Sequence, residues 1–118
     1  RSIYIGDSTA EAWEFALNSA FARSYDYLIK VLKAANMLHI VKHDPDVPDR
    51  EVTPEYMMKN NLIIGDVDDC TRQLQDLWEV TGGFGTLLMI SHDWDNKAKW
   101  VRSMELLANE VVPTLPTI

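Results

Sequence analysis

The sequence is poor in cysteine, and this scarcity excludes several kinds of site. Cys70 is its one cysteine, so the chain of 118 residues can form neither an internal disulfide nor a cysteine-based metal cluster. Five glycines and five prolines are too few for a collagen-like or low-complexity chain. The composition is that of an ordinary globular domain, and a reducing compartment, the cytoplasm, is the expected location.

Cations are also scarce relative to carboxylates. Eleven Lys and Arg residues stand against 18 Asp and Glu residues, which gives a formal net charge of −7. Such a charge repels the phosphates of nucleic acids and the anionic surfaces of membranes. No apolar run approaches the roughly 18 to 20 residues that a membrane-spanning helix needs. We therefore predict neither a nucleic-acid partner nor a membrane partner.

Hydrophobic periodicity predicts mostly helix in the first half of the chain. Ser8–Glu11 has the pattern of a capping box, and apolar side chains then recur at helical spacing. Residues 1–38 are therefore predicted to form one long helix or two nearly collinear helices. Residues 39–61 begin with a proline-bearing loop and end with a short helix, which starts after Thr53 and runs to about Asn60.

Residues 62–118 are predicted to alternate strand, helix, strand and helix, the order of parallel βαβ units. Leu62–Gly65 is a β-branched run that favours a strand, and Asp66 is a plausible cap for the helix that follows. Gly82 and Gly83 supply the left-handed stop that commonly ends a helix. The whole pattern indicates a helix-rich α/β fold with few short parallel strands.

The second predicted strand covers residues 86–90. This run is apolar without alternation, which is typical of a strand covered on both faces. The chain supplies few neighbours for it, so the missing partners are expected from the rest of a longer protein or from a second copy of the chain. A polar turn follows, in which Asp95 is predicted to cap a final helix that Pro113 ends.

A family resemblance runs through residues 62–115. It is carried by four pieces in order: Ile64-Gly65-Asp66 before a helix, Gly82-Gly83-Phe84-Gly85 before a strand, His92-Asp93-Trp94 after it, and the run from Ser103 to Pro113. In that order and spacing they resemble the C-terminal end of luciferase-like flavin-dependent monooxygenases, most closely the limonene and alkanal monooxygenase-like branch. Upstream, residues 3–13 and 44–57 resemble that branch's segment after its sixth strand and its insertion before the penultimate helix.

The resemblance implies a fold and a reaction. The parent protein is expected to be a TIM-type (β/α)8 barrel, of which this chain is about the last third. The expected cofactor is FMN, reduced by a separate flavin reductase, and the expected reaction inserts one oxygen atom from O2 into a small organic substrate through a flavin peroxide. The chain alone would be an incomplete catalyst. A related deazaflavin-dependent oxidoreductase stays open as an alternative, and a homo-oligomer is expected because exposed strand edges need cover.

Barrel enzymes place their sites after the carboxyl ends of their strands, which here means the residues after 86–90. Ser91, His92 and Trp94 are therefore the predicted cofactor-binding residues. His92 is also the predicted catalytic residue, because histidine titrates near neutrality and can donate a hydrogen bond to a flavin edge or peroxide. The alternative is a structural loop whose polar residues cap the next helix and whose tryptophan packs on a neighbour.

Residues 39–61 are interpreted as a lid-like insertion over the barrel mouth. His39, His43 and Asp44 are its predicted substrate-facing residues. A histidine pair four residues apart beside a carboxylate also occurs in metal sites, but a proline-bearing loop of this length more often covers a site, so no metal is predicted.

A function of a different class also fits the sequence: a helical domain that binds a partner protein through its amphipathic faces and does no chemistry. The carboxylates of Asp66, Asp68 and Asp69 do not decide between the two, because acidic residues in the first turn of a helix are explained by the helix dipole. The flavoenzyme interpretation depends on residues 86–90 forming a buried strand.

Overall fold

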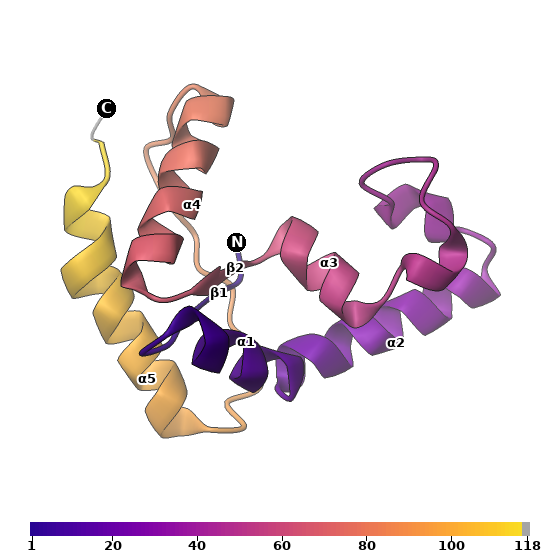
Figure 1. The fold of residues 1–118 in the computed structure, drawn as a ribbon, viewed down its shortest axis with the longest axis horizontal. Helices are drawn as coiled ribbons and strands as arrows, with labels where there is room; N and C mark the ends of the chain where they lie inside the picture. The colour runs from indigo at the N-terminus through magenta and orange to yellow at the C-terminus, as the bar shows by residue number, and fades with distance from the viewer. Residues whose placement is uncertain (117–118) are drawn as a thin grey trace.

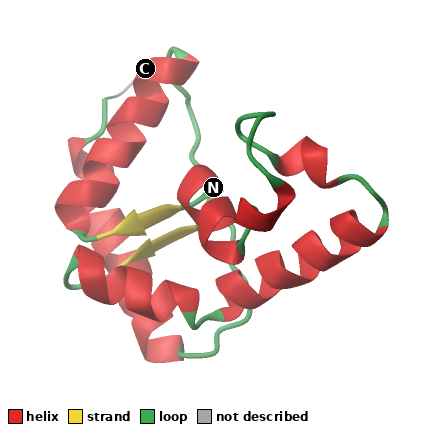
Figure 2. Cartoon of the chain, turned by 45° about the vertical axis from the view of Figure 1, so that its right-hand side comes forward, coloured by secondary structure: helices red, strands yellow, loops and turns green. Residues whose placement is uncertain are grey.

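Two short parallel strands lie at the centre of the chain, with helices around them (Figures 1 and 2). β1 (Ile3–Ile5) pairs with β2 (Ile63–Gly65). The computed structural model describes residues 1–116, so the last two residues of the predicted unit 62–118 lie outside the described residues. Every residue of both strands is buried. The predicted strand before Asp66 is confirmed, and so is the helix-rich α/β class with few short parallel strands.

The first helical region consists of two helices, the second of the predicted alternatives. Ser8 caps α1 (Thr9–Leu17) by accepting a hydrogen bond from the amide of Glu11, as the capping-box pattern predicts. The helix then breaks, and the hydroxyl of Ser19 caps α2 (Ala20–Ala34) by accepting from an amide of its first turn. The break separates a short helix that covers the sheet from a long helix that extends beyond it (Figure 1).

The predicted insertion folds as three short helical pieces. These are η1 (Leu38–Val41), η2 (Asp49–Glu51) and α3 (Pro54–Asn61). Thr53 caps α3 by accepting from an amide of its first turn, so this predicted helix is confirmed. A separate apolar cluster joins these pieces to α2; its buried members are Leu38, Val52 and Met57.

α4 (Val67–Thr81) begins and ends where the sequence predicts. The Asp66 carboxylate accepts from the amide of Asp69, and Gly82 closes the helix in the left-handed conformation at φ 74°. Cys70 faces the sheet, and burial raises the pKa of its thiol to about 12. The cysteine therefore stays protonated and acts as a small buried hydrophobe.

The predicted strand at residues 86–90 is wrong. The segment is irregular, and the side chains of Leu88 and Ile90 are 73% and 55% exposed. The amide of Ile90 donates to the carbonyl of Arg1 at 2.8 Å, and the Arg1 amino group donates to the carbonyl of Leu88 at 2.7 Å. This is the alternation of a single parallel bridge on the edge of β1 away from β2. A doubly covered strand needs neighbours on both sides, and the described residues give this segment only the Arg1 end of one strand.

The last helix starts one residue later than predicted, and a different residue caps it. Asn96, not Asp95, caps α5 (Lys97–Leu106) by accepting from the amide of Lys99. A π-helical turn, η3 (Leu107–Val111), and a short 3-10 turn, η4 (Val112–Thr114), continue α5 as far as the predicted end near Pro113.

Helices cover both faces of the sheet (Figure 2). The larger buried cluster on one face includes Tyr4, Phe21, Ile64 and Trp100, and the cluster on the other face includes Ile3, Ile5, Leu74 and Val111. Among the large side chains of the helices, Phe21 and Trp100 are buried, and Trp13, Trp78 and Met104 are half-buried. Within residues 1–116 the helices are too short or too polar to span a membrane.

Glycines at the ends of both strands let the helices start close to the sheet. A Cβ atom on Gly6 would lie 3.0 Å from the Cβ of Ala12, and one on Gly65 would lie 2.8 Å from the Cβ of Asp69. The hydroxyl of Thr9 joins the two helix starts by donating to the Asp69 carboxylate. Small residues are therefore required where each strand passes into its helix.

Candidate functional site

The predicted cofactor-binding loop borders a polar cavity of about 440 Å³. We call it the His92 cavity; its lining residues are Ala20, Arg23, Ser24, Ser91, His92 and Asp93. Two elements form it, the first turns of α2 and the irregular chain that follows residues 86–90. The structure thus brings Ser91 and His92 together. Trp94 does not line this cavity, and its side chain is 45% exposed.

Three residues from distant parts of the chain hold the imidazole ring of His92. The Nε2 atom lies 3.3 Å from the hydroxyl oxygen of Ser2, and the Nδ1 atom lies 3.4 Å from that of Ser24. The ring also meets the ring of Phe21 edge to face, with centroids 4.8 Å apart. Sequence reasoning missed both serines, since they lie 90 and 68 residues from the histidine and no local pattern connects them.

Asp95 connects the loop that carries His92 to α2 by hydrogen bonds. Its carboxylate accepts hydrogen bonds from the amide of Ala20 at 3.0 Å, the guanidinium of Arg23 at 2.9 Å and the indole of Trp100 at 3.0 Å. Partial burial acts to raise the pKa of this carboxyl, but the three hydrogen bonds outweigh it and the pKa lies below the ordinary value. Asp95 is therefore ionised at neutral pH and binds the start of α2, a role that differs from the predicted cap of α5.

A larger cavity of about 560 Å³ lies between α2 and the insertion, residues 39–61, which includes α3. We call it the insertion cavity; it is lined by Arg1, Ser2, Tyr25, Leu28, Ile40, Val41, Lys42, His43, Met57, Asn60, Asn61, Leu62 and Ile90. Of the three predicted lid residues, only His43 lines it. All three side chains are exposed, and the Asp44 carboxylate accepts from the amide of Asp46 in a local turn.

The two cavities adjoin along α2. Consecutive residues, Ser24 and Tyr25, line one cavity each, and Ser2 lines the insertion cavity while it contacts His92. Within the insertion, the amide of His43 donates to the hydroxyl of Tyr56 at 2.7 Å, and the apolar cluster of Leu38, Val52 and Met57 packs the insertion on α2. His43 and His92 therefore border neighbouring spaces.

The insertion cavity differs in charge from the chain as a whole. Among the described residues that line it there is no carboxylate, although the chain carries a net charge of −7. Burial raises the pKa of Tyr25, and the nearby charge of Arg1 opposes this only in part, so the phenol stays protonated at neutral pH. The cavity offers apolar side chains together with the phenol and other polar donors, which suits a small organic molecule with an acceptor oxygen.

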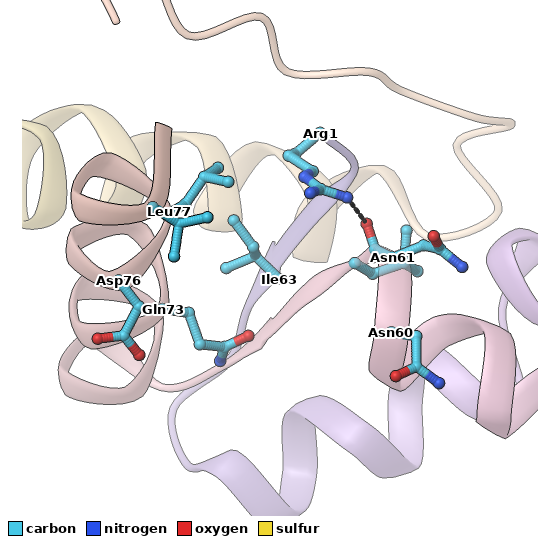
Figure 3. Close-up of a pocket in the computed structure, with 9 residues that line it drawn as sticks. Arg1, Asn60, Asn61, Ile63, Gln73, Asp76 and Leu77 are labelled. Carbon is cyan, nitrogen blue, oxygen red and sulfur yellow. Dashed lines mark hydrogen bonds between the residues drawn. The ribbon is translucent and has the colours of Figure 1, made fainter. Parts of the chain in front are cut away.

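A third cavity, of about 270 Å³, lies beside β2 and α4 (Figure 3). Two of its polar groups are bonded to the chain itself: the Arg1 guanidinium donates to the Asn61 carbonyl at 3.1 Å (Figure 3), and the Gln73 amide donates to the Ile64 carbonyl at 3.0 Å. This cavity leaves few convergent groups for a ligand. Within the described part of the chain, no three His, Cys, Asp or Glu side chains come together as metal ligands.

The chain has curated relatives among bacterial monooxygenases. It is 28% identical over 116 residues to 3,6-diketocamphane 1,6-monooxygenase of Pseudomonas putida, a match that covers 97% of this chain and 31% of that protein. It is 27% identical over 121 residues to 2,5-diketocamphane 1,2-monooxygenase 2 of the same organism, covering 99% and 33%. A shorter match, 39% identical over 64 residues, is with 4-hydroxyprotoasukamycin monooxygenase of Streptomyces nodosus subsp. asukaensis, covering 54% and 17%. No family model matches the chain.

A solved structure matches the whole chain. It is a type II Baeyer-Villiger monooxygenase, the oxygenating constituent of 3,6-diketocamphane monooxygenase from Pseudomonas putida, in complex with FMN. The match has a TM-score of 0.84 and 27% identity, and covers 100% of this chain and 33% of that chain. The chain therefore spans about a third of the length of these relatives. The predicted resemblance to flavin-dependent monooxygenases is confirmed, and the relatives favour it over the interaction domain.

Proposed function

We propose that this chain is part of a flavin-dependent monooxygenase that inserts one oxygen atom from O2 into a small organic substrate. The observation that carries the proposal is the match of the entire chain, at a TM-score of 0.84, to an oxygenating enzyme in complex with FMN. The proposed fold of the whole protein is the TIM-type barrel, and the two parallel strands with their covering helices are compatible with a part of one.

Reduced FMN is the proposed cofactor, delivered by a separate flavin reductase. The hydroxyl and imidazole groups of the His92 cavity suit the uncharged edge of a flavin. The phosphate does not suit this chain's helix starts, because the cavity beside them is lined by the three carboxylates of Asp7, Asp66 and Asp68 against the guanidinium of Arg102, which is already paired with Asp7. We therefore place the phosphate site outside this chain. The bound flavin supplies the oxygen chemistry, and these residues bind, orient and exclude water.

His92 is the proposed catalytic residue, and Ser91 beside it is a proposed contact of the cofactor. The support is their place in one cavity, with the His92 ring held against Phe21 and presenting its nitrogens to hydroxyl groups. Trp94, half-exposed after them, is proposed to contact the cofactor from the rim. An imidazole at this position can hold a proton close to a bound oxygen atom.

The insertion cavity is the proposed place of the substrate, with residues 39–61 as its cover. A volume of about 560 Å³ lies within the usual range for small organic ligands. His43 borders this cavity and is proposed to face the substrate. The roles of His39 and Asp44 as substrate-facing residues of the lid stay predictions. Because η1 and α3 pack on α2 through a cluster of their own, the cover is expected to be preformed.

Turnover by the full-length protein that carries this segment tests the proposal. With reduced FMN, we expect O2-dependent oxygenation of at least one member of a panel of cyclic ketones, terpenes and aldehydes. His92→Gln is expected to lower that rate by about 100-fold, the usual weight of a positioned acid or base. Lys33→Gln, an exposed change on α2, is the matched control and should keep the rate.

Two results would contradict the proposal. Failure to bind FMN, measured by quenching of flavin fluorescence, would remove the cofactor. Turnover with a reduced deazaflavin but not with FMN would favour the alternative oxidoreductase. For the 118-residue chain alone, we expect weak or no FMN binding, because most of the flavin cradle lies outside it.

A homo-oligomer and a cytoplasmic location complete the proposal. Apolar side chains are exposed along one side of α2, among them Tyr27 at 71%, and such side chains favour association. The lone reduced thiol of Cys70 supports a reducing compartment. Sedimentation of the full-length protein as a monomer would count against the oligomer.

A further inference from the structure

The two serines that contact His92 differ in burial, and this difference carries a further inference. Ser2 is only 7% exposed, whereas Ser24 lies on the exposed side of α2 and lines the His92 cavity. We propose that Ser2 and Ser24 hold His92 as the neutral tautomer protonated at Nδ1, so that the Ser24 hydroxyl hydrogen points into the His92 cavity as a donor to an acceptor oxygen of the ligand. This inference rests on the proposed function and names its donor group.

The buried serine determines where the ring proton lies. A hydroxyl carries one proton, and a buried polar group is costly when its proton finds no acceptor. Among the described residues, Nε2 of His92 is the hydrogen-bond partner of the Ser2 hydroxyl, at 3.3 Å. The proposal assigns the Ser2 proton to Nε2, which makes Nε2 the unprotonated nitrogen of the ring.

The direction of the hydrogen bond to the exposed Ser24 follows from that assignment of the ring proton. In a neutral imidazole with a bare Nε2, the proton lies on Nδ1, which then donates to the Ser24 oxygen at 3.4 Å. That oxygen accepts from the ring, so its own hydrogen is free to turn toward the cavity that Ser24 and His92 both line. The chain of donors runs in one direction, from Ser2 through His92 to Ser24.

Packing restrains the ring of His92. Phe21 is fully buried and meets the His92 ring at an interplanar angle of 90°, with centroids 4.8 Å apart. Asp95 fixes the loop that carries the histidine through its bond to the amide of Ala20. Ser2 is therefore a positioning residue, which acts through His92, and Ser24 is the residue that contacts the ligand.

The chemistry of the ligand follows from the donor. A hydroxyl hydrogen in a cavity of about 440 Å³ recognises an acceptor oxygen, and the proposed function places the flavin ring, with its carbonyl oxygens, in this cavity. Such a bond orients the carbonyl without transferring a proton.

The tautomer can be measured without turnover. In full-length protein labelled with ¹⁵N-histidine, long-range proton–nitrogen correlation spectra distinguish a protonated ring nitrogen from a bare one, and loss of the signal in His92→Gln assigns it. We expect a protonated Nδ1 and a bare Nε2 at pH 8. Ser2→Ala should give a mixture of tautomers, and Ser91→Ala, a serine in the same cavity without a bond to the ring, should leave the tautomer unchanged.

A protonated Nε2 in the unmodified protein would overturn the inference, and this result does not depend on whether any variant folds. Loss of oxygenation activity by contrast bears on the proposed function, since the spectrum is independent of catalysis. For the ligand contact, Ser24→Ala should raise the Kd for FMN about fivefold to tenfold, measured by quenching of flavin fluorescence, while Ser24→Thr restores it to within about twofold. An unchanged Kd in Ser24→Ala would overturn the donor role.

Discussion

Two regions of this chain carry similar apolar sequences and fold differently. The first is the sheet core, made of β1, β2 and the helices α1 and α4, where all strand residues are buried. The second is the site segment, residues 82–96, where an equally apolar run stays irregular and half exposed. The difference teaches that an apolar run becomes a strand only where neighbours complete its hydrogen bonds. The region left irregular is also the one that bears the candidate site.

A matched pair of leucines gives the largest expected contrast between the two regions. Leu74 is fully buried on α4 in the sheet core, and Leu88 is 73% exposed in the site segment. Leu74→Ala should lower the free energy of unfolding by about 2–5 kcal/mol because it leaves a cavity. Leu88→Ala should change it by at most about 0.5 kcal/mol. Denaturant titration of each variant measures both values, and equal losses would show that the site segment is packed as tightly as the core.

Two glycines test the same difference between the sheet core and the site segment, with a smaller expected change in stability. A Cβ atom on Gly65 would lie 2.8 Å from the Cβ of Asp69, whereas one on Gly85 would have nothing within 4 Å. Gly65→Ala is expected to cost about 1–3 kcal/mol of unfolding free energy, because the start of α4 must move. Gly85→Ala should be neutral or stabilise by about 0.4–1 kcal/mol through the unfolded state. The prediction fails if thermal unfolding ranks the two changes in the opposite order.

Asp95 joins the two regions, and its removal should have the smallest effect of the three. Asp95→Asn is expected to cost about 1 kcal/mol, as for the loss of a helix cap. The pKa of this carboxyl is lower in the folded chain than in the unfolded one, so its contribution is complete above about pH 4 and is lost as pH falls through the folded pKa. The stability difference between the original chain and Asp95→Asn should therefore shrink as the pH falls below about 4. A difference constant over that range would contradict the assigned hydrogen bonds.

Local signals predicted the helices of the fold well. Ser8, Thr53 and Asp66 each cap a helix through a bond to an amide three residues ahead, and Gly82 ends one by its own backbone conformation. Interactions of this range are visible in any short window of sequence. They do not specify which strand edge a segment will meet, so residues 86–90 were assigned to a strand that the described chain does not form.

The candidate site was predicted only in part for the same reason. His92 and Ser91 were found from their position after an apolar run, which needs no knowledge of packing. The partners of the ring, Ser2 and Ser24, depend on the way α2 and β1 meet the site segment. The flavoenzyme interpretation itself depended on the strand at 86–90; its support comes instead from relatives that match the chain from end to end.

The hydroxyl of Ser103, on α5, accepts from the amide of Ile5 at 2.8 Å. If the parallel bridge at Arg1 were extended residue by residue, that amide would instead bond to the carbonyl of His92. Helix α5 has thus taken a donor that could otherwise pair with the loop that carries the histidine. A buried serine on a helix closes this edge of β1, and the segment that bears the catalytic candidate continues without that bond.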